Sequence, residues 1–245
     1  MSSLRLIRHV FGQLARGRRL LGLTLLASVP GLVAWIAGGG ETNADKLEIY
    51  DIVVSTGSGA TLSIAVLVLG AAAMRDERDA GTLPFLYLSP IPRWRFALAT
   101  WMGASGVAIL VAVGGWLVGW LGLGVGSGDW GHAWASLPAY VAGAVGYSAI
   151  FIPVGYLFSR AILVGLAYVF IWEGILTTLI SGIAASSVWK TALSIFADLR
   201  ELPRDALDAL GPVLPGAGGG VAKLVGVVLV SLTIFTWALR ARDAL

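Results

Sequence analysis

Residues 96–124 read FALATWMGASGVAILVAVGGWLVGWLGLG, a run without a single charged side chain. A helix rises about 1.5 Å per residue, so roughly 20 apolar residues cross the ~30 Å hydrocarbon core of a bilayer. This run is longer than that, and we expect its helix to tilt or to project beyond the bilayer. It predicts a transmembrane helix.

Further apolar runs lie on both sides of it, at about 20–39, 53–74, 138–158, 161–183 and 219–239. Hydrophobic residues make up 57% of the chain and charged residues 13%, about half the ~25% charge of an ordinary soluble domain. This composition excludes a water-soluble enzyme and a disordered tail, and the lack of cysteine excludes a disulfide scaffold. We expect an all-α membrane protein, a single transmembrane domain over 1–245 with six transmembrane helices.

The segment 1–19 is basic and amphipathic. Its apolar residues Leu4, Ile7, Phe11 and Leu14 recur at helical spacing among several arginines. This pattern predicts an N-terminal interfacial helix that lies against membrane lipid in the headgroup plane. A signal peptide is the competing interpretation, but its charged region would be shorter and a small-x-small cleavage site would follow.

The distribution of Lys and Arg predicts the orientation. With both termini cytoplasmic, most of the 17 basic residues fall on the inner side: Arg5, Arg8, Arg16, Arg18, Arg19, Arg75, Arg78, Arg93, Arg95, Arg160, Arg240 and Arg242. The outer side keeps Lys46, Lys190, Arg200, Arg204 and Lys223. This asymmetry favours six spans in a cell membrane, the plasma or inner membrane, with both ends inside.

The connection 184–218 on the outer side predicts a helical hairpin. Val188, Trp189, Ala192, Leu193, Phe196 and Leu199 form one helical stripe. Pro203 could then open a second short helix that ends near Gly211. Both helices are too short to cross a bilayer, so we expect them to lie in the outer leaflet or to cap the bundle before the sixth span.

No constellation of catalytic or metal-binding residues is apparent. His9 and His132 are the two histidines, and neither has a metal-ligand partner at the usual spacing. An intramembrane serine hydrolase is a remote hypothesis, because Ser58 has no histidine in any span to activate it. The glycine-rich run before Lys223 lacks the Gly-Lys-Ser/Thr of a phosphate-binding loop. We therefore expect a chain that is not an enzyme, holds no cofactor or metal and binds no nucleic acid.

Glu173 is the one acidic residue deep inside an expected span. Charged groups at this depth usually face the interior of the bundle or a wet cavity. One hypothesis places Glu173, with Thr177 one turn further on, in a substrate pathway or a proton-linked step. The other makes Glu173 a protonated side chain that fixes helix packing, with Ser63 and Tyr147 as possible partners across the bundle.

Glycines at Gly115, Gly119, Gly122 and Gly126 repeat a four- and three-residue spacing in the third span. Such small faces let helices approach closely. In a chain with several spans they indicate internal helix packing more often than a dimer interface.

The most specific stretch is the inner loop 77–93, ERDAGTLPFLYLSPIPR. Thr82 can cap a short helix with Pro84 in its first turn, and Ser89-Pro90-Ile91-Pro92 would end it. This helix would carry Phe85 and Leu86 as apolar knobs, which suits docking into a groove of a partner. The alternative is a plain amphipathic connector that rests on lipid.

This loop resembles the inner-loop signature of the ABC type-2 exporter permease family, an acidic residue followed by Gly-Thr-Leu, then Leu and Ser-Pro-Ile-x-Arg. The matching residues are Glu77, Gly81, Thr82, Leu83, Leu86, Ser89, Pro90, Ile91 and Arg93. The order of an interfacial helix, six spans and two short outer helices also resembles that family over nearly the whole chain. Pro84 departs from it, because the family often has Glu there.

The resemblance implies the transmembrane permease subunit of an ATP-driven exporter. Residues 77–93, with Phe85, would form the coupling helix, seated on a separate ABC ATP-binding subunit that holds the ATP and Mg²⁺. A second permease copy or a paralogue would complete the assembly, and by analogy Glu173 would lie near the central pathway. The alternative is a structural or scaffold subunit of a larger membrane complex, without transport.

Overall fold

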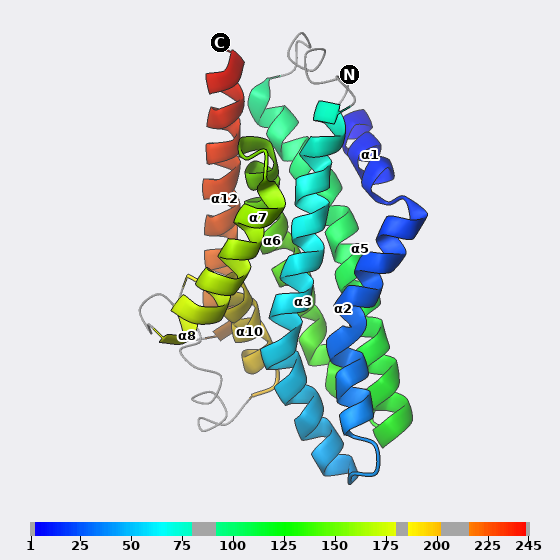
Figure 1. Cartoon of the computed structure of the whole chain (residues 1–245). Coiled ribbons are helices and arrows are strands. Elements are labelled where there is room, and N and C mark those ends of the chain that lie inside the picture. The colour runs from blue at the N-terminus through cyan, green and yellow to red at the C-terminus, as the bar shows by residue number, and fades with distance from the viewer. Residues whose placement is uncertain (1–2, 80–91, 180–185, 202–215, 244–245) are drawn as a thin grey trace.

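The computed structural model describes residues 3–79, 92–179, 186–201 and 216–243, and every element assigned in these ranges is a helix. The predicted all-α class is therefore confirmed. Figure 1 shows the elements, which follow the chain as α1 (Ser3–Leu14), α2 (Gly17–Ala37), α3 (Asn43–Asp79), α5 (Arg93–Ser127), η1 (His132–Ser136), α6 (Leu137–Leu157), α7 (Ala161–Ala167), η2 (Tyr168–Leu176), α8 (Thr177–Leu179), α10 (Val188–Leu199) and α12 (Gly216–Asp243).

Five helices in the described ranges are long and apolar enough to cross a membrane: Gly17–Ala37, Asn43–Ala73, Arg93–Ser127, His132–Leu157 and Gly216–Ala241. The chain is thus a multi-pass membrane protein. The run expected as the fifth of six spans, 161–183, contains a shorter apolar helix, Ala161–Leu176. Because a straight α-helix of that length covers less than the ~30 Å hydrocarbon core, the count of six spans stays a prediction.

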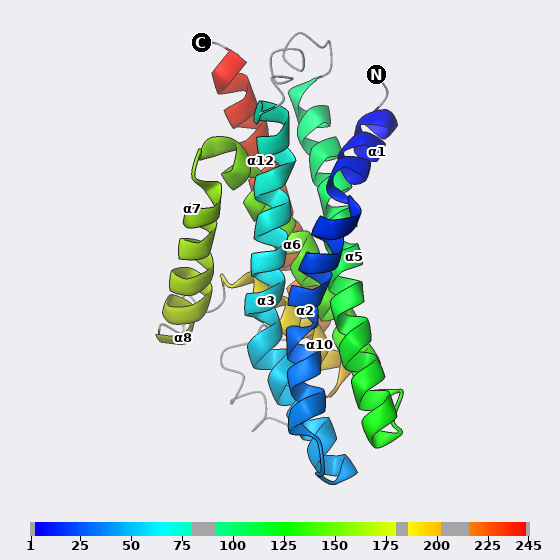
Figure 2. The same ribbon diagram turned by 45° about the vertical axis from the view of Figure 1, so that its right-hand side comes forward.

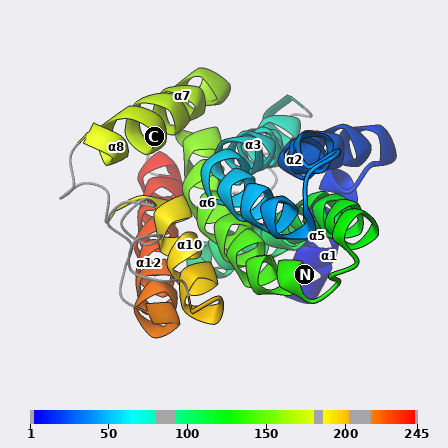
Figure 3. The ribbon, with the colours of Figure 1, turned by 90° about the horizontal axis from the view of Figure 1, so that it is seen from below.

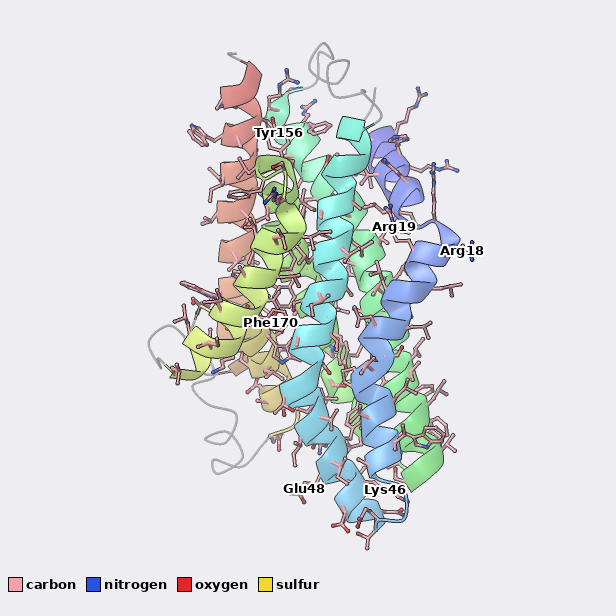
Figure 4. The ribbon with its side chains drawn as sticks, in the orientation of Figure 1. Arg18, Arg19, Lys46, Glu48, Tyr156 and Phe170 are labelled. Carbon is pink, nitrogen blue, oxygen red and sulfur yellow. The ribbon has the colours of Figure 1, made fainter. Side chains whose placement is uncertain are left out.

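Both ends of the chain lie at the same end of the bundle, here named the terminal end (Figures 1 and 2). The last turn of α3 and the first turn of α5 also lie there. The connection between α2 and α3 lies at the other end, here named the opposite end. Figure 4 shows labelled residues in these two parts of the bundle. Arg18 and Arg19 lie near the junction of α1 and α2, whereas Lys46 and Glu48 lie at the opposite end.

Helices α2 and α5 cross in direct backbone contact. A Cβ atom added to Gly31 would lie 2.6 Å from the Cα of Gly119, and one added to Gly115 would lie 2.7 Å from the backbone of Ala27. Gly122 and Gly126 face Trp35 of α2. The glycine face of α5 therefore packs within the chain, as the sequence predicted.

A second close crossing joins α3 and α6. A Cβ added to Gly155 would meet the carbonyl oxygen of Gly70 at 2.6 Å, and one added to Gly70 would meet the backbone of Phe151 at 2.8 Å. Two glycines on facing helices let the backbones touch, since no side chain separates them. These crossings make α2, α3, α5 and α6 one compact unit (Figure 2).

The amphipathic helix α1 packs against α5 near the terminal end. Leu6, Val10 and Leu14 are buried there, and the Gly103 backbone is close enough that an added Cβ would meet Ile7 and Val10 at 2.9 Å. Of the predicted apolar stripe, Leu14 is buried and Ile7 and Phe11 are partly buried, whereas Leu4 is 76% exposed. The buried face of α1 is therefore rotated relative to the predicted stripe. Gly103 and Gly106 of α5 have no side chains, so Val10 and Phe11 of α1 can pack against the α5 backbone.

Helix α10 does not lie on the surface of the bundle. It is inserted between α3, α6 and α12, and Val188 to Ala197 are nearly all buried (Figure 3). The indole of Trp189 sits against Gly59, and its Nε1–H donates to the carbonyl oxygen of Ser55 at 2.9 Å. Five residues of the predicted stripe are buried, and Leu199 is 53% exposed. The second helix predicted from Pro203 lies outside the described residues.

The segment 161–179, made of α7, η2 and α8, stands at the margin of the bundle (Figure 3). It contacts α6 and α3, with Gly165 against the side chain of Leu67 and the Tyr168 ring edge-on to Phe151 at 5.8 Å. Leu163, Phe170 and Ile175 point away from the core and are 52–61% exposed. In the bilayer, this face lies against lipid or another subunit.

Candidate functional site

Glu173 lies in η2, a stretch of nine residues with π-helical hydrogen bonding. A π-helix closes i→i+5 bonds, is rare, and is usually limited to a single turn. Phe170, three residues earlier in the same element and labelled in Figure 4, is 57% exposed. The wider turn therefore coincides with the acidic residue that the sequence singles out.

Both carboxylate oxygens of Glu173 accept hydrogen bonds. The hydroxyl of Tyr168 donates to Oε1 at 3.0 Å, and the backbone N–H of Val188 donates to the same atom at 2.9 Å. The hydroxyl of Ser187 donates to Oε2. Three donors satisfy the carboxylate, so its burial between η2 and α10 carries a small desolvation penalty.

These contacts form an N-terminal cap for α10. Ser187 is the N-cap residue, and its Oγ accepts the backbone N–H of Lys190 at 3.0 Å. Val188, the first residue of the helix, has a backbone N–H with no acceptor inside the helix, and Glu173 supplies one. A carboxylate at this place also interacts favourably with the positive end of the helix dipole.

Thr177 and Lys190 link the same two elements a second time. The Thr177 hydroxyl donates to the backbone carbonyl of Glu173 at 2.6 Å, and Lys190 Nζ donates to the carbonyl of Thr177 at 2.8 Å. Burial lowers the pKa of the Lys190 ammonium, and the charge of Glu173 acts in the opposite direction. Glu173, Thr177 and Lys190 thus connect η2 and α8 with the first turn of α10.

Of the two partners considered for Glu173, Tyr147 lies within electrostatic range of its carboxylate. The Tyr147 ring is fully buried in α6, and its hydroxyl has no hydrogen-bond partner in the described part of the chain. Ser63 instead donates to the carbonyl of Ala60 in its own helix at 2.9 Å. The polar groups of Glu173, Tyr168 and Tyr147 therefore gather between η2, α6 and α10.

The residues predicted to couple to an ATPase fall mostly outside the described residues. These are Gly81, Thr82, Leu83, Phe85, Leu86, Ser89 and Pro90, together with Ile91 of the family motif. Glu77 lies in the last turns of α3, and Arg93 is the first residue of α5. The end of α3 and the start of α5 both lie at the terminal end (Figure 1).

Two polar contacts in the bundle were missed by sequence reasoning. The Ser58 and Tyr140 hydroxyls lie 2.6 Å apart and are both buried, which links α3 to α6. At the opposite end, His132 Nε2 lies 2.9 Å from Asp51 Oδ1, and the His132 side chain is only 6% exposed. The partners are more than 80 residues apart in each pair, and spacing along the chain could not reveal them.

Comparison with protein-family models found no match, and comparison with curated proteins found no similar sequence.

Proposed function

We propose that this chain is the permease subunit of an ATP-driven ABC exporter, with both termini on the cytoplasmic side of the cell membrane. In this proposal the terminal end of the bundle faces the cytoplasm, and the chain itself hydrolyses nothing. A separate ABC ATP-binding subunit holds ATP and Mg²⁺, and a second permease copy or a paralogue completes the translocation unit.

One observation carries the proposal. The two helices that flank residues 77–93 reach the terminal end together, where both chain ends also lie (Figures 1 and 2). The loop with the Gly-Thr-Leu and Ser-Pro-Ile-x-Arg motif therefore starts and ends on the side of the arginine-rich α1. A segment anchored in two long helices can transmit a push from a cytoplasmic partner into the bundle.

Within this proposal, Phe85 and Leu86 insert into a groove of the ATP-binding subunit. Glu77 and Arg93 mark the ends of the coupling segment, one on α3 and one on α5. ATP-driven closure of the partner then moves α3 and α5 as levers. Because α6 and α10 pack on α3, the movement reaches the junction that contains Glu173 and Thr177, which we assign to the substrate pathway.

A structural or scaffold subunit without transport is the second candidate. The observation in its favour is that both carboxylate oxygens of Glu173 are already occupied by donors from the same chain. A carboxylate whose two oxygens already accept hydrogen bonds stabilises the contact between η2 and α10, with or without transport of a substrate. The two candidates differ in what the chain assembles with.

The test is purification of the tagged chain from its own host in mild detergent. The permease proposal expects a nucleotide-binding subunit in equal amount, detected by photo-crosslinked azido-ATP, together with ATP hydrolysis in the purified complex. The double variant Phe85→Asp, Leu86→Asp should lose the nucleotide-binding subunit and the ATP hydrolysis. The control Leu4→Asp, an apolar-to-acidic change at the exposed end of α1, should keep the subunit and the hydrolysis. If the double variant copurified with the ATP-binding subunit in full amount, the proposal that Phe85 and Leu86 dock on that subunit would be refuted. A stable complex free of nucleotide-binding protein would favour the scaffold.

A further inference from the structure

Three charged or titratable side chains from distant parts of the chain meet at the opposite end of the bundle. Asp51 belongs to α3, His132 begins η1, and Arg200 is the C-cap residue of α10. Arg200 Nη2 lies 3.4 Å from Asp51 Oδ2 and 3.3 Å from His132 Nε2. The cluster thus fastens the C-terminal end of α10 to α3 and to the connection between α5 and α6.

The hydrogen bonds of this cluster compete for one nitrogen atom. His132 Nε2 cannot donate to Asp51 and accept from Arg200 at the same time, and Arg has only donors. The shorter 2.9 Å contact assigns the Nε2 hydrogen to Asp51. Arg200 then depends on Asp51 Oδ2 alone at 3.4 Å, and its Nε is buried without a partner in the described residues. The Arg200 guanidinium therefore has the weakest hydrogen bonds of the three side chains in the cluster.

A second proton on the imidazole changes this balance. The ring keeps its Nε2–H bond to Asp51 and gains a positive charge 3.3 Å from the guanidinium. One carboxylate then faces two cations, and a charge-assisted bond to the nearer one becomes stronger. Repulsion between like charges at this distance is large in a partly desolvated site.

We propose that His132 is a proton-binding site that controls the attachment of α10: the neutral imidazole leaves Asp51 shared with Arg200, and the protonated imidazole takes Asp51 and releases Arg200. The cluster is accessible from outside the chain, because the Asp51 and Arg200 side chains are 21% and 28% exposed, whereas that of His132 is 6% exposed. Release frees the end of α10 that lies farthest from Glu173. The inference uses these three residues alone and does not depend on the proposed function.

The other groups around His132 do not replace these partners. The Tyr50 ring of α3 packs edge-on at 6.1 Å, and its hydroxyl contacts Ser136 at 3.0 Å. Asp129, in the turn before η1, accepts the backbone N–H groups of Gly131 and His132 at 2.8 and 3.1 Å. From α5, the nearby Trp116 is neutral and donates to Ser136 and to the carbonyl of Ala133, and α6 begins directly after Ser136.

Because the chain has no cysteine, a single introduced cysteine can carry a spin label at a chosen position. A nitroxide on Leu199→Cys, the exposed last residue of α10, reports the mobility of that end in nanodiscs between pH 8 and pH 5, the range in which His titrates. We expect the ratio of mobile to immobile label to rise as pH falls, with a one-proton dependence. His132→Gln, which stays neutral and can donate to Asp51, should abolish the rise. His9→Gln, which removes the other histidine, should leave it unchanged.

A second readout needs no substitution at His132. With isotope-labelled histidine, the chain gives two imidazole signals, and His9→Gln identifies the one from His132. The midpoint of its titration should coincide with that of the label. Arg200→Gln should give a mobile label at every pH. The proposal is overturned if the label stays immobile throughout, if it is released equally in His132→Gln, or if the two midpoints differ.

Discussion

The carboxylate of Glu173 and the backbone N–H of Val188 are joined at 2.9 Å, although 15 residues separate them along the chain. This contact makes an acidic side chain of η2 part of the N-terminal cap of α10, a helix whose residues are mostly buried. The π-helical turn of η2 brings the carboxylate to that position. The segment 161–179, which otherwise touches the bundle through a narrow face, is thereby attached at one of its ends.

Replacing Glu173 by Ala should lower the free energy of unfolding by about 1–3 kcal/mol, because the Val188 N–H and the Ser187 hydroxyl lose their acceptor. Glu173→Gln should cost less, since the amide oxygen still accepts one of these bonds. Thermal unfolding in detergent measures both. The matched control is Glu48→Gln, an exposed acid of α3 at the opposite end (Figure 4), which should leave stability unchanged.

Transport distinguishes the two roles that the sequence left open for Glu173. If Glu173→Gln assembles and keeps most of its stability but transports at an altered rate, the residue belongs to the pathway. Normal transport by a less stable variant would assign it to packing alone.

The sequence could single out Glu173 because a charge inside an apolar run is unusual, but it could not identify the partners. Val188 contributes a backbone N–H, which has no signature in side-chain composition. One hypothesis placed Thr177 beside Glu173 in a substrate pathway. The Thr177 hydroxyl does bond to that residue, at the backbone carbonyl and not at the carboxylate. Helical periodicity also gives no indication of a π-helix, because the apolar pattern of 168–176 fits either hydrogen-bonding scheme.

The buried pair of Ser58 and Tyr140 should behave as a coupled unit. Ser58→Ala or Tyr140→Phe alone leaves one buried hydroxyl without its partner and should cost about 1–3 kcal/mol. The double variant removes both polar groups, so its loss should be smaller than the sum of the single losses. Additive losses would show that the two hydroxyls do not interact. A fluorophosphonate probe should leave Ser58 unlabelled, because its hydroxyl is buried and bonded to Tyr140.

Close glycine contact between α2 and α5 should be sensitive to a single methyl group. Gly31→Ala places its Cβ 2.6 Å from the Cα of Gly119, and relief of that clash requires movement of a helix backbone. We expect a loss of about 1–3 kcal/mol in stability, as for other overpacked interiors. Gly22→Ala in the same helix meets no atom within 4 Å and should be neutral or slightly stabilising. Equal effects would contradict this packing.

The sequence predicted the all-α membrane class, because charge-free apolar stretches of about 20 residues form helices in a bilayer. It predicted that glycines such as Gly115 and Gly119 serve packing, but not that α2 is their partner. The docking of α1 on α5 was also hidden, since Gly103 and Gly106 have no apolar side chain that would mark a binding surface. These features depend on contacts between segments, whereas periodicity reports one segment at a time.

Single cysteines in this cysteine-free chain can test whether the segment 161–179 crosses the bilayer. Leu4→Cys and Leu86→Cys should react with a membrane-impermeant maleimide from the cytoplasmic side only. Glu201→Cys, which follows α10, should react from the other side only, because a crossing by 161–179 separates it from the turn at Arg160. Labelling of Glu201→Cys from the cytoplasm would contradict both this crossing and the position of Arg200 beside Asp51 at the opposite end. Labelling of Leu86→Cys from outside would mean that the loop 77–93 lies on the side opposite to a cytoplasmic ATPase. The permease proposal would then be wrong.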